Sequence, residues 1–395
     1  MNQKKLAIIG ASYLQEPLIE KAKEMGIETH VFAWAAGDVG EKSSDYFYPI
    51  SIVEKDAVAD KCREIGVDGI CTIATDLGAS TVNYVANKLG LVGNSPYAAE
   101  VSTNKKAMRD CFLKNGDPSP RSIEVCTGKL KKPITDASIG ALLQKEGFRY
   151  PVIVKPTDRS GSRGIFKMQD ETGLSKAVKE ASEVSFEHGV LVEEFVTGQE
   201  YSVEYISWKG QHHFLQLTQK YTTGAPHFIE TGHLEPAPVS KETLEKIKAV
   251  VSHALTSLHI EYGASHSELK IDQEGQIRLI EIGGRMGGDL IGSTLVPLST
   301  GVDFMKAVIQ IALGEEPDLS LNHAGKPAGV RFIFTKEDIE NLNRMKKDPE
   351  IDIVCEEVHP ITNDAVSDSS TRFGCYVFTA DSREKLMNYL PENRL

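Results

Sequence analysis

The chain has 395 residues, of which 41% are hydrophobic, so it can form about two to four packed units. Its formal net charge of −12 and the lack of a long basic run exclude a nucleic acid as the expected partner. The six cysteines show no CxxC spacing, and no apolar run reaches the roughly 18 residues that cross a bilayer. We therefore expect a cytoplasmic protein with reduced thiols, without a zinc ribbon or a membrane partner.

The first hundred residues alternate short apolar runs, such as LAIIG and GICTIATD, with helical patterns. This alternation is typical of βαβ units and predicts a doubly wound parallel sheet. The first strand leads into IIGASYLQEP, which lacks the second and third glycines of the GxGxxG fingerprint. A dehydrogenase is therefore a weak alternative, because it would depend on this strand alone.

The helix that contains TNKKAM should end at Gly116, and Asp117–Pro120 follows as a linker because each proline disfavours helix in the residue before it. Beyond the linker, α+β patterns predict two hairpins, one of them turning at Lys209-Gly210, and a strand-rich end. The expected class is α/β and α+β. The expected units are an N-terminal α/β unit (1–115), a small α+β unit (116–190), a large α+β unit (191–315) and a C-terminal β-rich segment packed on it (316–395).

The second hairpin, ASHSELKI and QIRLIEI, places two glutamates on one face. With an even-length turn centred on Gln273-Glu274, Glu281 faces His266 and Glu268 faces Leu279, so the two carboxylates are diagonal neighbours. Two carboxylates that close repel each other, and a hard cation such as Mg²⁺ relieves the repulsion while leaving positions for phosphate oxygens. Mn²⁺ is a second candidate, and the alternative is a solvated strand face.

Four glycines surround Arg285 in the stretch IGGRMGG that follows Glu281. Glycines let backbone approach a bulky anion without interference from Cβ. The planar guanidinium of Arg285 can bind a phosphate or a carboxylate through two parallel hydrogen bonds. The alternative is a turn that carries an exposed arginine.

A lysine at the end of an apolar strand precedes a Gly/Ser loop in YPVIVKPTDRSGSRGIF. An ammonium group beside backbone N–H groups is suited to phosphate, although no GxxxxGK[ST] loop is present. The loop joins two strands, so we expect a flap over phosphates rather than a helix-opening cradle. The residues of this candidate phosphate site are Lys155, Ser160, Gly161, Ser162 and Gly164.

The stretch VLVEEFVTGQEYSVE offers a candidate nucleoside site. The backbone at Glu193, Glu194, Phe195 and Val196 can face the edge of a base, and Glu200 can accept hydrogen bonds from two ribose hydroxyls. Taken alone, the stretch is equally an ordinary strand and turn.

Taken in order, TNKKAM, VIVKP with SGSRG, VEEFVTGQE, SELK and LIEIGGR resemble the ATP-grasp superfamily over roughly residues 1 to 335. In that superfamily ATP lies between two α+β subdomains. The resemblance implies that Lys105 and Lys155 contact ATP phosphates and that SGSRG closes over them. It further implies backbone contacts to adenine from Glu194 and Val196, Glu200 on the ribose, Mg²⁺ on Glu268 and Glu281, and Arg285 on an acyl phosphate.

One departure narrows the resemblance: Gly283 stands where many ATP-grasp members have asparagine, two residues after the second metal glutamate. This form looks like the L-amino acid ligase branch. In HFIETGHLEPAP, Glu230 and His233 match residues that line the amino-acid pocket of that branch, although His233 could equally be a solvated loop histidine. Arg331 matches a strand arginine of several relatives, or else forms a structural ion pair.

The expected reaction is therefore ATP-dependent ligation of a carboxylic acid, such as an amino acid, to an amine through an acyl phosphate, with release of ADP. Electrostatic stabilisation is the main task of such a site, and Glu230 and His233 are candidate bases for the amine. The alternatives are a purine-pathway or biotin carboxylase-like enzyme of the same fold and a nucleotide-binding regulator without catalysis. The partners are small molecules, and self-association into a homodimer stays open.

Overall fold

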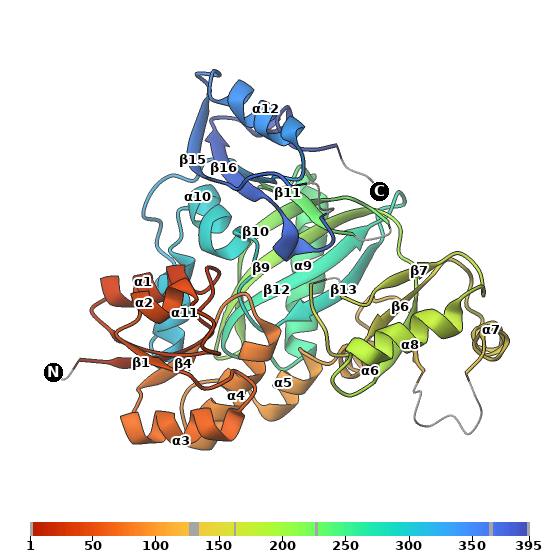
Figure 1. Ribbon diagram of the computed structural model, residues 1–395, viewed down its shortest axis with the longest axis horizontal. Coiled ribbons are helices and arrows are strands. Elements are labelled where there is room, and N and C mark those ends of the chain that lie inside the picture. The colour runs from red at the N-terminus through yellow and green to blue at the C-terminus, as the bar shows by residue number, and fades with distance from the viewer. Residues whose placement is uncertain (1–2, 126–133, 162, 226–227, 363–365, 393–395) are drawn as a thin grey trace.

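The computed structural model describes residues 3–125, 134–161, 163–225, 228–362 and 366–392 of the chain. Its strands form three sheets, one parallel and two antiparallel, with helices packed on them (Figure 1). The mixed α/β and α+β class expected from the sequence is confirmed. Within the described residues, no helix combines the length and the apolarity that a membrane crossing requires.

The N-terminal sheet is parallel and has the strand order β3-β2-β1-β4. Helices α3 and α4 cover one face, and α1 covers the other together with α11, which arrives from much later in the chain. These elements are β1 (Lys5–Ile9), α1 (Glu16–Glu24), β2 (Glu28–Phe32), α2 (Val39–Ser43), β3 (Tyr46–Tyr48), α3 (Lys55–Ile65), β4 (Gly69–Cys71), α4 (Asp76–Leu89) and α11 (Phe304–Ala312).

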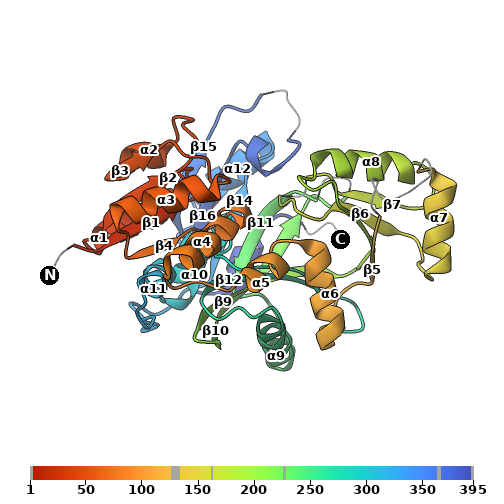
Figure 2. The ribbon, with the colours of Figure 1, turned by 90° about the horizontal axis from the view of Figure 1, so that it is seen from below.

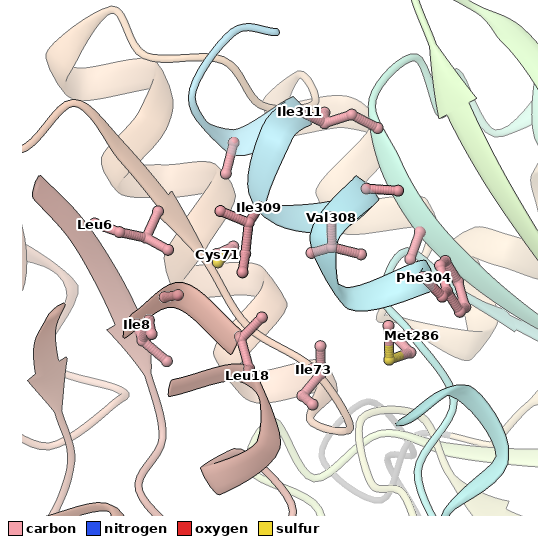
Figure 3. Packing of buried hydrophobic residues seen from close by; sticks show 14 of the residues in the cluster. Leu6, Ile8, Leu18, Cys71, Ile73, Met286, Phe304, Val308, Ile309 and Ile311 are labelled. Carbon is pink, nitrogen blue, oxygen red and sulfur yellow. The ribbon is translucent and has the colours of Figure 1, made fainter. Parts of the chain in front are cut away.

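Figure 3 shows the core that fixes this sheet to the rest of the molecule. Leu6, Ile8 and Cys71 of the parallel strands pack with Ile309 of α11, and the same cluster includes Met286 from the glycine-rich stretch. Because this contact is apolar and fully buried, the carboxyl ends of β1 and β4 are held against residues 283–288.

The largest sheet has eight antiparallel strands in the order β13-β12-β9-β10-β11-β14-β16-β15, which cross the centre of Figure 1. Its strands are β9 (Gln199–Trp208), β10 (Gln211–Thr222), β11 (Glu230–Glu235), β12 (Gly263–Ile271), β13 (Ile277–Gly283), β14 (Ala328–Phe332), β15 (Ile351–Val358) and β16 (Gly374–Ala380). The expected C-terminal segment thus continues this sheet instead of only packing on it. The helices associated with it are α9 (Lys241–Ser257), η1 (Ile291–Leu295, a π-helix), α10 (Val296–Thr300), α12 (Lys336–Met345), η2 (Ser369–Thr371) and α13 (Arg383–Met387).

The second four-stranded sheet, which we call the small sheet, is antiparallel, lies at the right of Figures 1 and 2, and has the order β5-β8-β6-β7. It consists of β5 (Ser122–Glu124), β6 (Val152–Pro156), β7 (Phe166–Met168) and β8 (Val190–Glu194), with α7 (Asp136–Lys145) and α8 (Leu174–Val184) on it. The unit boundary expected after residue 190 is wrong in detail, because β8 pairs with β6 along its whole length.

Two short helices, α5 (Pro96–Val101) and α6 (Lys105–Asn115), were expected in the N-terminal unit but pack on the large sheet. Met108 and Phe112 are fully buried there with Val251 and Leu279. Helix α6 begins at Asn104, whose side chain accepts hydrogen bonds from the N–H groups of Lys106 and Ala107. This cap places Lys105 at the first helical position, facing the sheets.

Candidate active site

A cavity of about 190 Å³ lies between the small sheet and the large sheet. It holds most of the residues that the sequence predicts to be functional, and the first residue of α4, Asp76, also reaches it. The predicted residues that line it are Lys105, Lys155, Ser160, Gly161, Glu193, Glu194, Phe195, Val196, Glu200, Glu230, Glu268, Glu281 and Arg285. Ser162 lies outside the described residues, and Gly164 sits beside α8, next to Val184.

The two lysines expected to contact phosphate are both buried and both paired with glutamates. Lys155 Nζ lies 2.6 Å from Glu193 Oε2, and Arg109 Nε lies 2.8 Å from Glu193 Oε1. Burial lowers the pKa of Lys155, whereas the Glu193 carboxylate opposes that effect. The Glu193 side chain therefore holds Lys155. The sequence had suggested a role for the Glu193 backbone alone.

Lys105 reaches the cavity from the start of α6. Its Nζ donates to the carbonyl oxygen of Arg159 at 2.6 Å and contacts Glu281 Oε1 at 2.7 Å. The first contact ties the Gly/Ser loop to the large unit, because Arg159 immediately precedes Ser160 and Gly161. The second contact shows that the Glu281 carboxylate is already paired with the Lys105 ammonium group.

The predicted nucleoside end of the cavity is apolar. Ile153, Ile165 and Ile280 line it beside the segment Glu194–Val196, and the Lys167 ammonium lies 3.7 Å from the Phe195 ring centroid. The sequence did not identify these isoleucines, because they come from β6, the loop before β7 and β13. An apolar slot beside exposed backbone groups suits a flat aromatic base.

The predicted metal glutamates are directly opposite each other. Glu268 pairs with Glu281 across β12 and β13, whereas the sequence placed them diagonally. The expected register was one residue off in the outer part of the hairpin, and a β-bulge between Glu268 and Leu269 adds a second shift. Together the two shifts amount to two residues, so both glutamates still lie on one face of the sheet. The expectation of two adjacent carboxylates is therefore correct although the expected register is not.

The two carboxylates fit a hard divalent cation. Each already forms an ion pair at 2.7 Å, Glu268 with the ammonium group of Lys220 and Glu281 with that of Lys105. No group of three or more metal-binding side chains occurs in the described part of the chain. A cation held by these two glutamates would thus depend on phosphate oxygens and water for its other ligands, as Mg²⁺ commonly does in nucleotide sites.

Lys220, on β10, is a central cation of the cavity that sequence reasoning missed. Its Nζ lies 2.7 Å from Glu268, 3.1 Å from Glu200 and 3.4 Å from Glu230. The side chain is 4% exposed, and although burial opposes it, the three carboxylates raise its pKa well above the ordinary value. Lys220 thus links the predicted ribose, metal and amino-acid positions, and QLTQKYT offered no motif by which to find it.

A buried ion pair supports the metal glutamates from behind. His266 Nδ1 bonds to the Glu204 carboxylate, which also accepts a hydrogen bond from the N–H of Gly287 at 3.0 Å. Although burial opposes it, Glu204 raises the pKa of His266 to about 9. A Cβ on Gly287 would lie 2.7 Å from Glu204 Oε1, so this glycine is needed for the pair to fit.

Arg285 is held by a carboxylate from the N-terminal unit. Its Nε and Nη2 donate to the two carboxylate oxygens of Asp76 at 2.9 and 3.0 Å. A Cβ on Gly283 would lie 2.8 Å from Asp76 Oδ1, so Gly283 makes room for this carboxylate. Two of the four glycines therefore accommodate protein carboxylates, whereas the sequence suggested room for a substrate anion.

Glu230, the first residue of β11, lines the cavity and is contacted by two C-terminal residues. Glu230 Oε2 accepts a hydrogen bond from Ser369 Oγ at 3.2 Å, and Arg372 Nη1 donates to the Glu230 carbonyl oxygen at 3.4 Å. Arg372 also forms a two-point ion pair with Asp289, at 2.7 and 3.1 Å. Neither Asp289 nor Arg372 was identified from the sequence, since they lie 83 residues apart and match no motif.

His233 differs from its expected role as a solvent-accessible base. It is fully buried, it contacts the Phe332 ring edge-on, and neither ring nitrogen has a hydrogen-bond partner among the described residues. Burial lowers the pKa of His233 to about 3, so the ring is neutral at neutral pH. Such an imidazole is a poor proton acceptor, but it can donate a hydrogen bond to a neutral group or accept one from it.

The structure does not bring Arg331 to the cavity. Its Nη2 donates to Asp338 Oδ1 at 2.7 Å, and its Nη1 donates to the Tyr389 carbonyl oxygen at 2.8 Å. On β14, Arg331 is registered with Gly232, whereas Val330 is registered with His233. Since neighbours along a strand point to opposite faces, Arg331 points away from the site, and the expectation of a role there is corrected.

Comparison with known families identifies the central part of the chain. Residues 148–293 match the family model described as the ATP-grasp domain. This range spans β6 to η1 and includes the predicted metal glutamates, Lys155, Lys220 and Arg285.

Among curated proteins, the chain is 27% identical over 333 residues to the protein y4rH of Sinorhizobium fredii, a match that covers 81% of this chain and 66% of the relative. It is 26% identical over 317 residues to the alanine–anticapsin ligase of Bacillus subtilis, covering 71% of this chain and 64% of the relative. The matched region thus spans about two thirds of the length of these relatives.

Among solved structures, the L-amino acid ligase of Bacillus licheniformis is similar with a TM-score of 0.78 and 24% identity, over 98% of this chain and 96% of that chain. Phosphoribosylglycinamide synthetase of Anaerococcus prevotii is similar with a TM-score of 0.74 and 23% identity, over the same shares of the two chains. At these identities the two likenesses establish the fold.

Proposed function

The chain is a member of the ATP-grasp superfamily, and from this premise we propose that it is an ATP-dependent carboxylate–amine ligase that joins two amino acids. The observation that carries the proposal is that the residues of two predicted sites, one for the nucleotide and one for the amino acid, line the same cavity. The glutamates proposed to hold metal and the lysines proposed to contact phosphate line the same cavity as Glu230, and Lys220 contacts both Glu230 and Glu268.

In the proposed complex, the apolar slot beside Glu194–Val196 takes adenine, and Glu200 takes the ribose hydroxyls. Lys105 and Lys155 stabilise the phosphates, and the Gly/Ser loop at Ser160–Gly161 excludes water from them. Mg²⁺ held by Glu268 and Glu281 would offset the negative charge on the phosphates. Lys105 and Lys220 would then exchange their glutamate contacts for phosphate oxygens.

The first step transfers the γ-phosphoryl group to the carboxylate of one amino acid, giving an acyl phosphate and ADP. Arg285, held in place by the Asp76 carboxylate, stabilises negative charge on that acyl phosphate and on the tetrahedral adduct. In the second step, the amine of the other amino acid attacks the acyl carbon, and phosphate leaves as the amide forms.

The attacking amine must lose a proton, and Glu230 is the better of the two expected bases. Burial and the nearby Asp289 carboxylate raise the pKa of Glu230, which brings it closer to the operating pH. His233, with a pKa of about 3, is too weak a base for this task.

A second candidate function is ligation of a ribonucleotide substrate. A cleft of about 810 Å³ adjoins the cavity, shares Asp76, Lys105 and Glu281 with it, and is lined by Lys55, Lys88 and Asn104. That volume exceeds what an amino acid needs. The similarity to phosphoribosylglycinamide synthetase supports this alternative at the level of the fold.

The test is phosphate release by the purified protein with ATP, Mg²⁺ and all pairs of the common amino acids, followed by mass spectrometry for the amide. We expect release that requires an amino acid and yields a dipeptide and ADP. Glycinamide ribonucleotide, aminoimidazole ribonucleotide and biotin serve as competing substrates. Stimulation by one of these, with no response to any amino acid, would exclude the amino acid ligase.

A further inference from the structure

Asp289 lies beside Glu230, which lines the cavity, because Arg372 Nη1 donates both to the Glu230 carbonyl oxygen and to the Asp289 carboxylate. The backbone of Asp289 is unusual. Asp289 and Leu290 have φ values of 49° and 65°, two successive residues in the left-handed region, and the π-helix η1 follows at once. Such conformations are unfavourable for residues other than glycine and persist where surrounding contacts impose them. Single π-helical turns are likewise frequent at functional sites.

Arg372 imposes this conformation on Asp289. Its Nη1 and Nη2 donate to the two carboxylate oxygens, and its Nε donates to the Ser369 carbonyl oxygen at 2.7 Å. The guanidinium carbon lies 3.7 Å from the centroid of the Phe332 ring. With these contacts the Arg372 side chain is only 6% exposed, so it is a fixed support and has little surface left for a ligand.

The accessible member of the pair is the carboxylate, because the Asp289 side chain is 22% exposed. Each of its oxygens accepts one hydrogen bond from Arg372 and keeps capacity for another. Tyr13, from the loop after β1, lies close enough for Asp289 to help raise the pKa of its phenol. An oriented carboxylate with free accepting capacity is suited to an organic cation.

Glu230 and Asp289 are two neighbouring acidic groups with different remaining partners. The Glu230 side chain is 19% exposed and contacts Lys220, which is shared with Glu200 and Glu268. The buried and unpartnered ring of His233 lies near Asp289, whose charge acts on its pKa. The polar atoms of Glu230, Asp289 and His233 thus keep hydrogen-bonding capacity that the described residues do not use. We place the end of the proposed substrate beside them.

We propose that Asp289, positioned by Arg372, is a specificity-determining residue, and that the acid substrate is an α-amino acid with a basic side chain. The side-chain cation binds Asp289, while the α-carboxylate points to Arg285 and the phosphates. An acidic side chain is disfavoured because it would face two carboxylates, and an apolar one would desolvate Asp289 without adding a second partner to its pair with Arg372. This inference rests on the proposed ligase function.

Matched substrate pairs test the inference without any variant. Arginine is compared with citrulline, which has the same shape without the charge, and lysine is compared with norleucine, which lacks the terminal ammonium group. We expect kcat/KM of the phosphate-release reaction to favour the basic member by roughly 10- to 100-fold. A ratio near one, or a preference for norleucine or glutamate, would overturn the inference and leave the ligase function standing.

The variant Asp289→Asn adds a second arm. It should reduce the arginine-to-citrulline ratio to about one by raising KM for arginine, with KM for ATP within about twofold of wild type. The matched control is Asp338→Asn, which weakens the Asp338–Arg331 pair on the other side of the sheet and should leave the ratio unchanged. An unchanged ratio in Asp289→Asn contradicts the inference. If no amino acid stimulates phosphate release by the wild-type protein, the proposed function itself fails.

Discussion

The two halves of the cavity are built in different ways. The nucleotide half, with Lys105, Lys155, Glu193, Glu268 and Glu281, stands on strand ends and the first turn of a helix, within or beside two sheets. Its cations and carboxylates are paired at 2.6 to 2.8 Å. Rigid elements suit chemistry that must place phosphates and metal within a few tenths of an ångström.

The acceptor half joins side chains from segments far apart in the chain. Asp76 comes from the N-terminal unit, Glu230 from a strand end, Asp289 from a strained turn and Arg372 from a C-terminal loop. Loops tolerate change better than strands and carry specificity in many folds. The difference suggests that the nucleotide half performs the general reaction and that the acceptor half selects the substrate.

The largest effect should come from damage to the nucleotide half. Glu281→Gln removes one of the two carboxylates proposed to bind Mg²⁺ with little change in volume, and it removes the charged partner of Lys105. We expect ADP formation to fall by roughly 1000-fold or more with every substrate. The matched control is Glu274→Gln, in the exposed turn of the same hairpin, which should behave as wild type. Wild-type turnover with unchanged Mg²⁺ dependence in Glu281→Gln would refute the metal assignment.

Lys220 connects the halves, so its loss should affect both. Lys220→Met removes the cation shared by Glu200, Glu230 and Glu268, and we expect kcat/KM to fall by about 100-fold. Mn²⁺ binding to the nucleotide-free protein should at the same time become about tenfold tighter, because the competing ammonium is gone. Calorimetry measures that affinity directly, and weaker or unchanged Mn²⁺ binding would contradict the assigned position of Lys220.

Substitutions in the acceptor half should cause a smaller loss of activity, and that loss should depend on the substrate. Asp76→Asn loses the charged partner of Arg285, and we expect kcat/KM for the amino acid to fall by about tenfold. KM for ATP should stay within twofold, whereas the exposed control Asp56→Asn should change neither parameter. An equal loss for ATP and amino acid would show that Asp76 serves the whole site and not the acceptor half.

The smallest effect concerns the scaffold under the acceptor half and is visible in stability only. Glu235 accepts hydrogen bonds from Thr218 and Ser299, and burial raises its pKa to about 8. Because the folded pKa exceeds the ordinary 4.5, the stability that Glu235 contributes at low pH is lost as pH rises from about 4.5 to 8. The stability of Glu235→Gln should therefore rise relative to wild type between pH 5 and 8, by at most about 1.4 kcal/mol per pH unit, so that the difference in Tm grows with pH. A constant difference in Tm across that range would refute the assignment.

The two halves also differ in how far the sequence predicts them. The sequence predicted the parallel sheet and the antiparallel hairpins, and it singled out the residues of the nucleotide half that line one cavity, because local periodicity and short motifs carry that information. It missed the direct pairing of Glu268 with Glu281, since a bulge cannot be read from alternating residues. It missed Asp76, Lys220, Asp289 and Arg372 because they meet only through long-range packing, and it misplaced Arg331 because strand registration decides which face a side chain occupies.

The central claim is that a substrate carboxylate takes the γ-phosphoryl group of ATP. The most direct measurement uses an amino acid labelled with ¹⁸O in its carboxylate, with ATP, Mg²⁺ and the second amino acid, and determines the label in the released phosphate by mass spectrometry. An acyl phosphate predicts one ¹⁸O atom transferred to phosphate for each amide formed. Amide formation with unlabelled phosphate would contradict the account.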